Sequence, residues 1–240
     1  MRLFIILAFL CTSTLSYAQS FEGTLTYVAD FRVSGDFIKA GVTKEALLAR
    51  MNQDGSWADT IWVSYKQGNY HTSKNTTPRS SAIYKPEANK IYSLQEGEHA
   101  GICTVTDASQ DLAYAGAGKK RIVQKIDTAV TVNGVACTLI RVKLEDQIID
   151  YYYNPGHLQV NPALFSQHKY EGLADFLKMS KALPLKMEKT INGMFTVTMT
   201  LVSTQAVAID EGIFTIPVLA PDPSLNLIKV ANQEVMRIKR

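Results

Sequence analysis

The chain has 240 residues, and its 25 Lys and Arg against 22 Asp and Glu leave a formal net charge of +3. A charge so close to zero argues against nucleic acid as a partner, because nucleic-acid binding needs clustered cations against phosphates. Beyond the N-terminal segment, no apolar run reaches the roughly 20 residues that span a bilayer, so we expect no transmembrane segment in the mature chain.

Residues 1–18 have the parts of a cleavable secretory signal peptide: a positive charge, an apolar run that ends at Leu10, and a small-x-small site that ends at Ala18. We predict cleavage between Ala18 and Gln19 and a periplasmic or secreted protein. The apolar run is too short for a membrane anchor. Cys11 follows this run as in lipoprotein signals, but Leu10 stands where lipoprotein processing requires a small residue.

Period-two alternation of apolar and polar residues predicts strands over most of the remaining chain. Asn133-Gly134 and Asn192-Gly193 are typical of tight hairpin turns. About a dozen short strands joined by tight turns indicate a mainly β (α+β) protein with one long, curved antiparallel sheet. The predicted strands are 21–31, 59–65, 69–73, 81–84, 90–94, 101–105, 121–132, 135–144, 147–153, 185–191, 194–204 and 213–216.

Two segments predict short helices that cover the concave face of the sheet. Thr43–Asn52 begins with Thr43 as N-cap. Asn161–Ser180 begins with Asn161 as N-cap and a proline at the first helical position, and Gly172 is expected to split it into two helices.

The C-terminal residues 221–240 form a tail after the single domain that we assign to residues 19–220. Proline signals a linker at the start of the tail. Ile228, Ala231, Val235 and Ile238 then fall at helical spacing, which predicts a short amphipathic helix. The helix either docks on the domain or, with its basic residues, contacts anionic lipid.

Two cysteines, Cys103 and Cys137, remain after the predicted cleavage. In an oxidising compartment they predict a disulfide, provided that their strands lie close together in the sheet. The alternative is two separate buried thiols that behave as small hydrophobic side chains.

No pattern of catalytic or metal-ligating residues stands out. The four histidines (His71, His99, His157 and His168) lack ligand spacing, so we expect no metal site and no cofactor. No Gly-x-Ser-x-Gly motif is present, and we assign no catalytic residues. Asp107 and Asp111 bracket a short turn and form either a carboxylate pair or a solvated loop. A hydrolase with an unrecognised site is the enzymatic alternative.

Short motifs along the chain carry a family resemblance. They are Phe21–Tyr27, Asn133–Thr138, Asp150–Tyr153, Leu183–Glu188 and Phe214–Pro217. Their order resembles that in uncharacterised secreted Gram-negative envelope proteins related in fold to the lipoprotein carriers LolA and LolB. The resemblance implies an unclosed β-barrel around helices, with an apolar cavity that accepts acyl chains. It transfers no ligand-binding residue to a position in this chain.

We therefore predict a non-enzymatic protein that binds a lipid or a lipoprotein acyl chain between sheet and helices. The alternative is an envelope protein–protein interaction module that uses its sheet edge or its tail. A loose cover of short helices leaves apolar space, although each residue taken singly also fits an ordinary packed core. The candidate lining residues are Leu25, Tyr27, Phe165, Phe176, Leu177, Met179, Phe195, Val197 and Met199.

Overall fold

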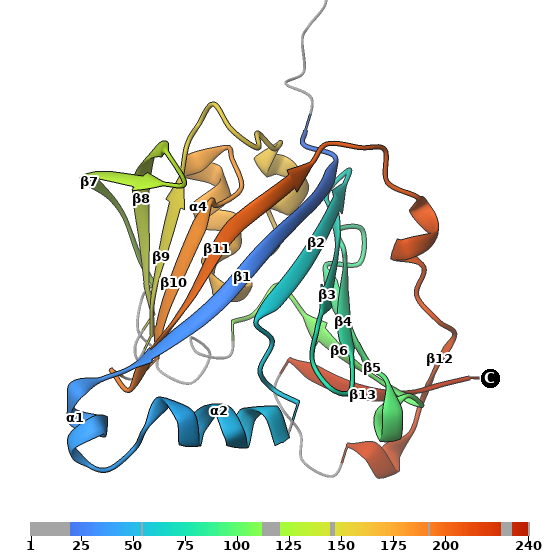
Figure 1. Ribbon diagram of the computed structural model, residues 1–240. Coiled ribbons are helices and arrows are strands. Elements are labelled where there is room, and N and C mark those ends of the chain that lie inside the picture. The colour runs from blue at the N-terminus through green and yellow to red at the C-terminus, as the bar shows by residue number, and fades with distance from the viewer. Residues whose placement is uncertain are drawn as a thin grey trace, which may run out of the picture.

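The computed structural model describes residues 20–53, 55–111, 121–144, 147–191, 193–226 and 232–239. The described strands form one antiparallel sheet of 13 strands in the order β12-β13-β6-β5-β4-β3-β2-β1-β11-β10-β9-β8-β7 (Figure 1). They are β1 (Gly23–Val33), β2 (Thr60–Lys66), β3 (Asn69–Lys74), β4 (Ser80–Lys85), β5 (Lys90–Gln95), β6 (Ile102–Asp107), β7 (Ile122–Val132), β8 (Val135–Leu144), β9 (Gln147–Tyr153), β10 (Lys186–Ile191), β11 (Phe195–Gln205), β12 (Leu219–Pro221) and β13 (Gln233–Ile238).

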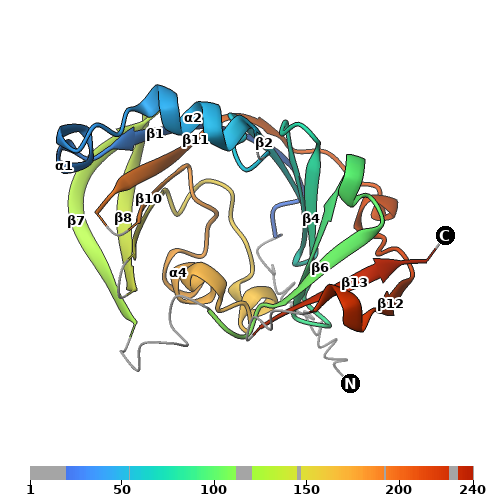
Figure 2. The same ribbon diagram turned by 90° about the horizontal axis from the view of Figure 1, so that it is seen from below.

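The sheet curves into an arch that is not closed into a barrel (Figure 2). A layer made of α4 (Leu173–Ser180) and the 3₁₀ turns Pro162–Phe165 and Tyr170–Gly172 lies inside the arch, against its concave face. We call these three segments the helical layer. The prediction of a mainly β protein with one curved antiparallel sheet and a few short helices is thus confirmed, and the second of the two predicted helical segments lies on the concave face.

Alternation of side chains fixes which face of each strand is buried. On β1, Leu25, Tyr27, Ala29 and Phe31 point to the concave side and are buried, while the residues between them are more exposed. Across the arch, the Tyr151 ring stacks on Phe176 of α4 at a centroid distance of 4.3 Å. Full burial of such a side chain contributes about 1.5–3 kcal/mol, so the helical layer and the concave face stabilise each other.

The helical layer starts and divides where the sequence predicts. The amide N–H of Ala163 donates to the Asn161 side chain at 3.0 Å, which confirms Asn161 as N-cap. Gly172 has a φ of 71° directly before α4, which confirms the predicted division. An added Cβ at Gly172 would lie 2.6 Å from Cγ1 of Val142 on β8. The glycine therefore permits both the left-handed turn and the close contact with the sheet.

The first predicted helix forms but lies elsewhere. The amide of Ala46 donates to Oγ1 of Thr43 at 3.1 Å, as expected for an N-cap. α1 (Gly35–Lys39) and α2 (Lys44–Gln53) have no buried residue, and Figure 1 places them below the ends of the central strands. They do not cover the concave face, and the apolar side chains of α2, Leu47, Leu48 and Met51, are only half-buried.

The tail is a strand, and the prediction of an amphipathic helix there is wrong. β13 pairs antiparallel with β6, from Gln233 opposite Thr106 to Arg237 opposite Ile102, and β12 pairs with β13. The open backbone groups of β6 accept a further strand, and this tertiary pairing overrides the helical spacing of the apolar residues. β12 and β13 consequently extend the sheet of the preceding domain. Residues 227–231 and 240 lie outside the described part.

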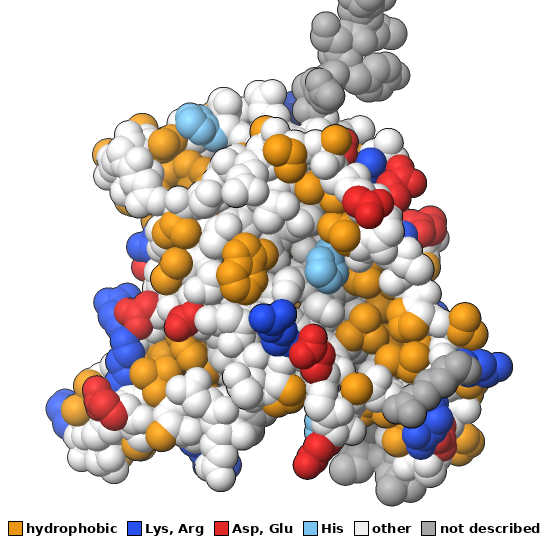
Figure 3. Space-filling view, turned by 45° about the vertical axis from the view of Figure 1, so that its right-hand side comes forward, with side chains coloured by type: hydrophobic (Ala, Val, Ile, Leu, Met, Phe, Trp, Pro, Cys, Tyr) orange, Lys and Arg blue, Asp and Glu red, His pale blue; other side chains and the backbone are white. Residues whose placement is uncertain are grey.

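The predicted strand at 213–216 is also wrong, because Glu211–Phe214 forms a 3₁₀ turn. This turn lies over the convex face, where Phe214 and Ile209 pack against Ile83 of β4. Elsewhere on this side, hydrophobic side chains form separate groups with charged side chains of both signs between them (Figure 3).

Cys103 and Cys137 are both buried and unpaired, so the predicted disulfide is wrong. Cys103 lies on β6 and Cys137 on β8, with eight strands between them in the sheet. Alternation places both side chains on the convex face, where they point away from each other. Burial raises the pKa of the Cys103 thiol to about 11. The predicted signal peptide and its cleavage site lie outside the described residues.

We predict that Gly172→Ala destabilises the fold by about 2–4 kcal/mol, because strain at a left-handed backbone adds to the clash with Val142. The matched control is Gly134→Ala in the β7–β8 turn, where φ is 81° and no atom lies within 4 Å of the added Cβ. That control should lose only about 1–2 kcal/mol. Urea denaturation measures the free energy of unfolding of both variants. Equal losses in the two variants would contradict the close contact between position 172 and Val142.

We further predict that a chain beginning at Gln19 contains two free thiols. After denaturation without reductant, iodoacetamide should alkylate both Cys103 and Cys137, as read by peptide mass spectrometry. In the folded protein both thiols should react slowly, since they are buried and burial raises the pKa of each above its ordinary value. Detection of the Cys103 and Cys137 peptides joined by a disulfide, with neither thiol alkylated, would contradict this prediction.

Candidate functional site

In the orientation of Figure 1, the helical layer lies against the upper part of the concave face, and side chains fill the space between them. Five of the nine predicted lining residues belong to the main hydrophobic core there and are almost fully buried: Leu25, Tyr27, Phe165, Phe176 and Leu177. The hydroxyl of Tyr27 donates to the carbonyl of Pro184 at 2.8 Å, so this part of the interior also satisfies its polar groups. Met179 on α4 is 43% exposed. These six residues therefore act as packing and surface residues of the helical layer.

The other three predicted lining residues lie lower on the same face, on β11. They form, together with two apolar neighbours on β10, a half-buried surface in which Lys189 lies between Met187 and Ile191, opposite Val197. Met187 and Met199 of this surface pack against the main core. Cross-strand pairs join Met187 to Met199 and Ile191 to Phe195. We call this surface the apolar wall; its residues are Met187, Ile191, Phe195, Val197 and Met199.

A polar hollow of about 270 Å³ lies at the lower end of β3–β6. It includes Lys74, Ser80, Ser93 and Thr104, which share the concave face by strand register. Among its described lining residues, no carboxylate occurs and Lys74 is the one charged group. The full lining is Gly55, Ser56, Lys74, Thr76, Ser80, Ser81, Ala82, Ser93, Leu94, Gln95, Ile102 and Thr104.

Trp57 connects the polar hollow with the apolar wall. It follows Ser56 of the hollow in the loop between α2 and β2. Its ring packs edge-on against Phe31 of β1 at 5.1 Å, and Phe31 in turn packs against Phe195 of the wall at 6.4 Å. The lower concave face therefore has a polar side and an apolar side, with an aromatic residue between them.

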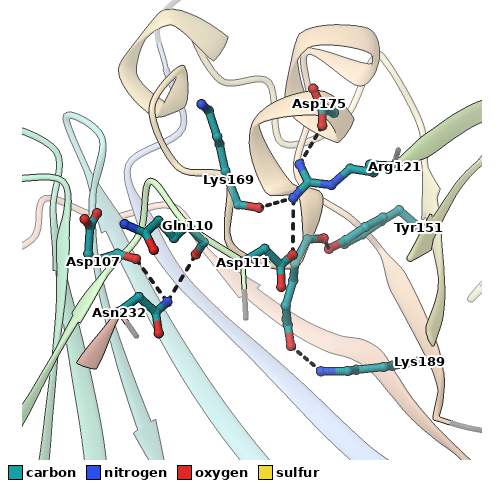
Figure 4. A network of polar contacts seen from close by, with 10 residues as sticks. Asp107, Gln110, Asp111, Arg121, Tyr151, Lys169, Asp175, Lys189 and Asn232 are labelled. Atoms are coloured by element: carbon teal, nitrogen blue, oxygen red, sulfur yellow. Dashed lines mark hydrogen bonds and ion pairs between the residues drawn. The ribbon is translucent and has the colours of Figure 1, made fainter. Parts of the chain in front are cut away.

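Arg121 holds the helical layer at the open side of the arch (Figure 4). Its guanidinium donates to Asp175 of α4 at 2.7 Å, to Asp111 at 3.3 Å and to the carbonyl of Lys169 at 2.8 Å. Asp111 follows β6 and Arg121 precedes β7, so this cluster joins α4 to segments from both sides of the arch. Asp107 instead accepts the amide of Ser109 at 2.8 Å. Asp107 and Asp111 thus do not form a shared carboxylate site.

Glu171 and Lys189 form a second tie between the helical layer and the sheet. Their side chains make an ion pair, and the hydroxyl of Tyr151 donates to the Glu171 carbonyl at 2.9 Å (Figure 4). Burial alone would lower the pKa of Lys189, but the Glu171 carboxylate outweighs it and raises that pKa. Glu171 has a φ of 54°, a conformation that these contacts hold in place.

His168 is buried within the aromatic part of the core. Its Nε2 is 2.9 Å from the hydroxyl of Tyr70, and its ring packs against Tyr84 at 4.5 Å. Burial lowers its pKa to about 4. His168 is therefore neutral at physiological pH and serves the packing of the helical layer.

Across the described part of the chain, no group of three His, Cys, Asp or Glu is arranged to hold a metal ion. None of the described helices combines the length and the apolar character needed to cross a membrane.

Comparisons with known proteins identify no family. No protein-family model matches the chain. No curated protein matches it. A solved structure described as PNGF-II in a C2 space group is 12% identical with a TM-score of 0.42, and the match covers 81% of this chain and 30% of that chain. A likeness at this level carries no argument about function.

Sequence reasoning missed the polar hollow. Its signal is a change along one face of each strand: Tyr84 and Ile91 are apolar near their hairpin turn, whereas Ser80 and Ser93 further along the same face are polar. The concave face of these strand ends is thus polar although the same face is apolar nearer the turn, whereas ordinary alternation keeps one face apolar along the whole strand. Such a change predicts that the packed layer stops part-way along the strands.

We predict that the stability of the protein falls between pH 6.5 and about 4 because of His168. In this window the unfolded histidine binds a proton and the folded one does not, so stability is full above pH 6.5 and decreases toward pH 4, by up to about 3 kcal/mol. His168→Gln, which keeps a polar partner for Tyr70, should flatten this dependence. The control is the exposed His157→Gln, and urea denaturation across the pH range gives the measurement. An unchanged profile in His168→Gln would contradict this assignment.

Proposed function

We propose that the protein binds an amphipathic ligand, a lipid or an acyl-bearing molecule, in the lower part of its concave face. The observation that carries the proposal is the pairing of a half-buried apolar wall with a polar hollow on one surface of the sheet. An acyl chain would contact the wall through residues such as Val197 and Phe195. The polar end would enter the hollow.

The packing of the upper half supports this placement. Phe165, Phe176 and Leu177 already fill the space between sheet and helices, so a ligand there would have to displace core side chains. Below the helical layer, the wall residues keep part of their apolar surface exposed. Burial of that surface by a ligand contributes about 25 cal/mol per Å².

The resemblance to the lipoprotein carriers LolA and LolB agrees with this proposal, as does an export signal at residues 1–18. Together they make the proposed protein a periplasmic or secreted carrier. The arch of strands in this carrier would present one apolar surface to a lipid or a lipoprotein acyl chain.

A protein partner at the sheet edge is the second candidate. β7 has 11 residues and is one edge of the described sheet, pairing on one side with β8. An edge of this length can accept a strand from a partner. The tail is the weaker docking element, because β13 already pairs with β6.

We predict that a brominated long-chain acyl probe quenches the fluorescence of Trp57. The chain has two tryptophans, and Trp62→Phe leaves Trp57 as the single reporter. In that background dibromostearic acid, or its methyl ester, should quench saturably because the probe lies between the wall and the hollow.

Val197→Asp should weaken quenching by both probes about tenfold or more, since a buried charge faces the acyl chain. The milder Val197→Thr keeps the shape of the side chain and should weaken it in the same direction. The matched control is Val202→Asp on the same strand, where the side chain is 54% exposed. Absence of quenching in the folded parent protein would refute the proposed function and leave the sheet-edge partner as the remaining candidate.

A further inference from the structure

We propose that the polar hollow is an oxyanion site, with Lys74 as its cationic group, that selects ligands whose polar end is a carboxylate or a phosphate. The inference rests on the proposed function and adds the chemical class of the ligand's polar end. None of the residues that line the hollow belongs to the motifs that carry the family resemblance.

The charges of the hollow favour an anion. Lys74 belongs to no ion pair with a described carboxylate, whereas several other lysines of the protein, such as Lys66 and Lys186, each lie within 4.0 Å of a glutamate. The described lining of the hollow contains no Asp or Glu. A half-buried ammonium group with no described carboxylate among its lining neighbours attracts an oxyanion more strongly than a solvated surface lysine does.

Hydroxyl and amide groups complete the site. Ser80, Ser93, Thr104 and Gln95 carry groups that can donate to an oxygen atom. Thr76 is only 4% exposed, and its Oγ1 is 3.0 Å from Oγ of Ser80. This contact orients the Ser80 hydroxyl at the lower end of the hollow. A cation with several surrounding donors is the arrangement that binds carboxylate or phosphate oxygens.

The rigidity of the surrounding sheet fixes these donors relative to one another. Lys74, Ser80 and Gln95 are in register across β3, β4 and β5. Thr104 of β6 is in register with Ser93, which lies two residues before Gln95 on the same face of β5. Donors on paired strands keep their spacing without a ligand, so binding requires little reorganisation. The loop that carries Ser56 covers one side.

The position of the hollow suits an anion attached to an acyl chain. Between β3, which carries Lys74, and β11, which carries Val197, there are three interstrand steps, or about 14 Å. The register places Lys74 level with Leu201, four residues along β11 from Val197, so the two positions are roughly 19 Å apart on the sheet. A single long-chain acyl group spans this separation. A fatty acid or a phosphate-bearing lipid can therefore place its head at Lys74 and its chain on the apolar wall.

The test compares dibromostearic acid with its methyl ester in the Trp62→Phe protein. The acid should bind more tightly than the ester, because only the acid presents an oxyanion to Lys74. Lys74→Met should weaken the acid about tenfold and leave the ester unchanged. The matched control is Lys90→Met, whose side chain is exposed on the opposite face of neighbouring β5 and should change neither probe.

Equal affinity for acid and ester in the parent protein, or an equal loss of both in Lys74→Met, would overturn the oxyanion site while leaving the proposed acyl binding in place. Lys74→Arg provides a second variant that keeps the charge and should retain the preference for the acid.

If neither probe quenches, the proposed function fails and the hollow is tested alone. Titration with inorganic phosphate or acetate is then followed by the backbone amide shifts of Ser93 and Thr104. Saturable shifts that disappear in Lys74→Met would show a site for a free anion. Absence of such shifts in the parent protein would overturn the inference.

Discussion

The helical layer covers only part of the concave face, and the rest of the structure depends on this limit. Phe176 and Leu177 can pack against the sheet because Tyr151 and its neighbours present an apolar surface there. The layer consists of one helix of eight residues and two 3₁₀ turns, which is too little to reach the lower ends of the strands. A curved sheet with an incomplete cover leaves part of its concave surface accessible.

Ionic ties decide where that cover sits. Arg121 binds α4 to the segments that follow β6 and precede β7, and Glu171 joins the layer to Lys189 on β10. Such half-buried pairs contribute more to a unique arrangement than to net stability, since desolvation of the charges offsets much of their attraction. Here they hold the layer at the open side of the arch. The lower concave face consequently keeps its two surfaces, apolar on β10 and β11 and polar on β3–β6.

The presence of an apolar and a polar surface on the lower concave face is the reason for proposing an amphipathic ligand. An interior lined evenly by apolar residues would favour a hydrocarbon, and an evenly polar one would favour a small hydrophilic molecule. Placing Val197 and Lys74 on one curved surface, with Trp57 between them, suits a molecule with two chemically different ends. Met187 and Met199 pack against the core and are half-buried, and in the proposed complex their exposed surface would contact the acyl chain.

Local patterns in the sequence determined the sheet class, most strand positions, the caps at Thr43 and Asn161 and the division at Gly172, because alternation and capping act over a few residues. Only the tertiary structure decided features that depend on pairing between distant segments. The open edge of β6 turned an apparent helix at Val235 into a strand, and sheet order separated Cys103 from Cys137 by eight strands. The same holds for the candidate site. Sequence identified Val197 as apolar and inward-facing, but Lys74 shares one face of the sheet with it only because β1 and β2 pair between β11 and β3.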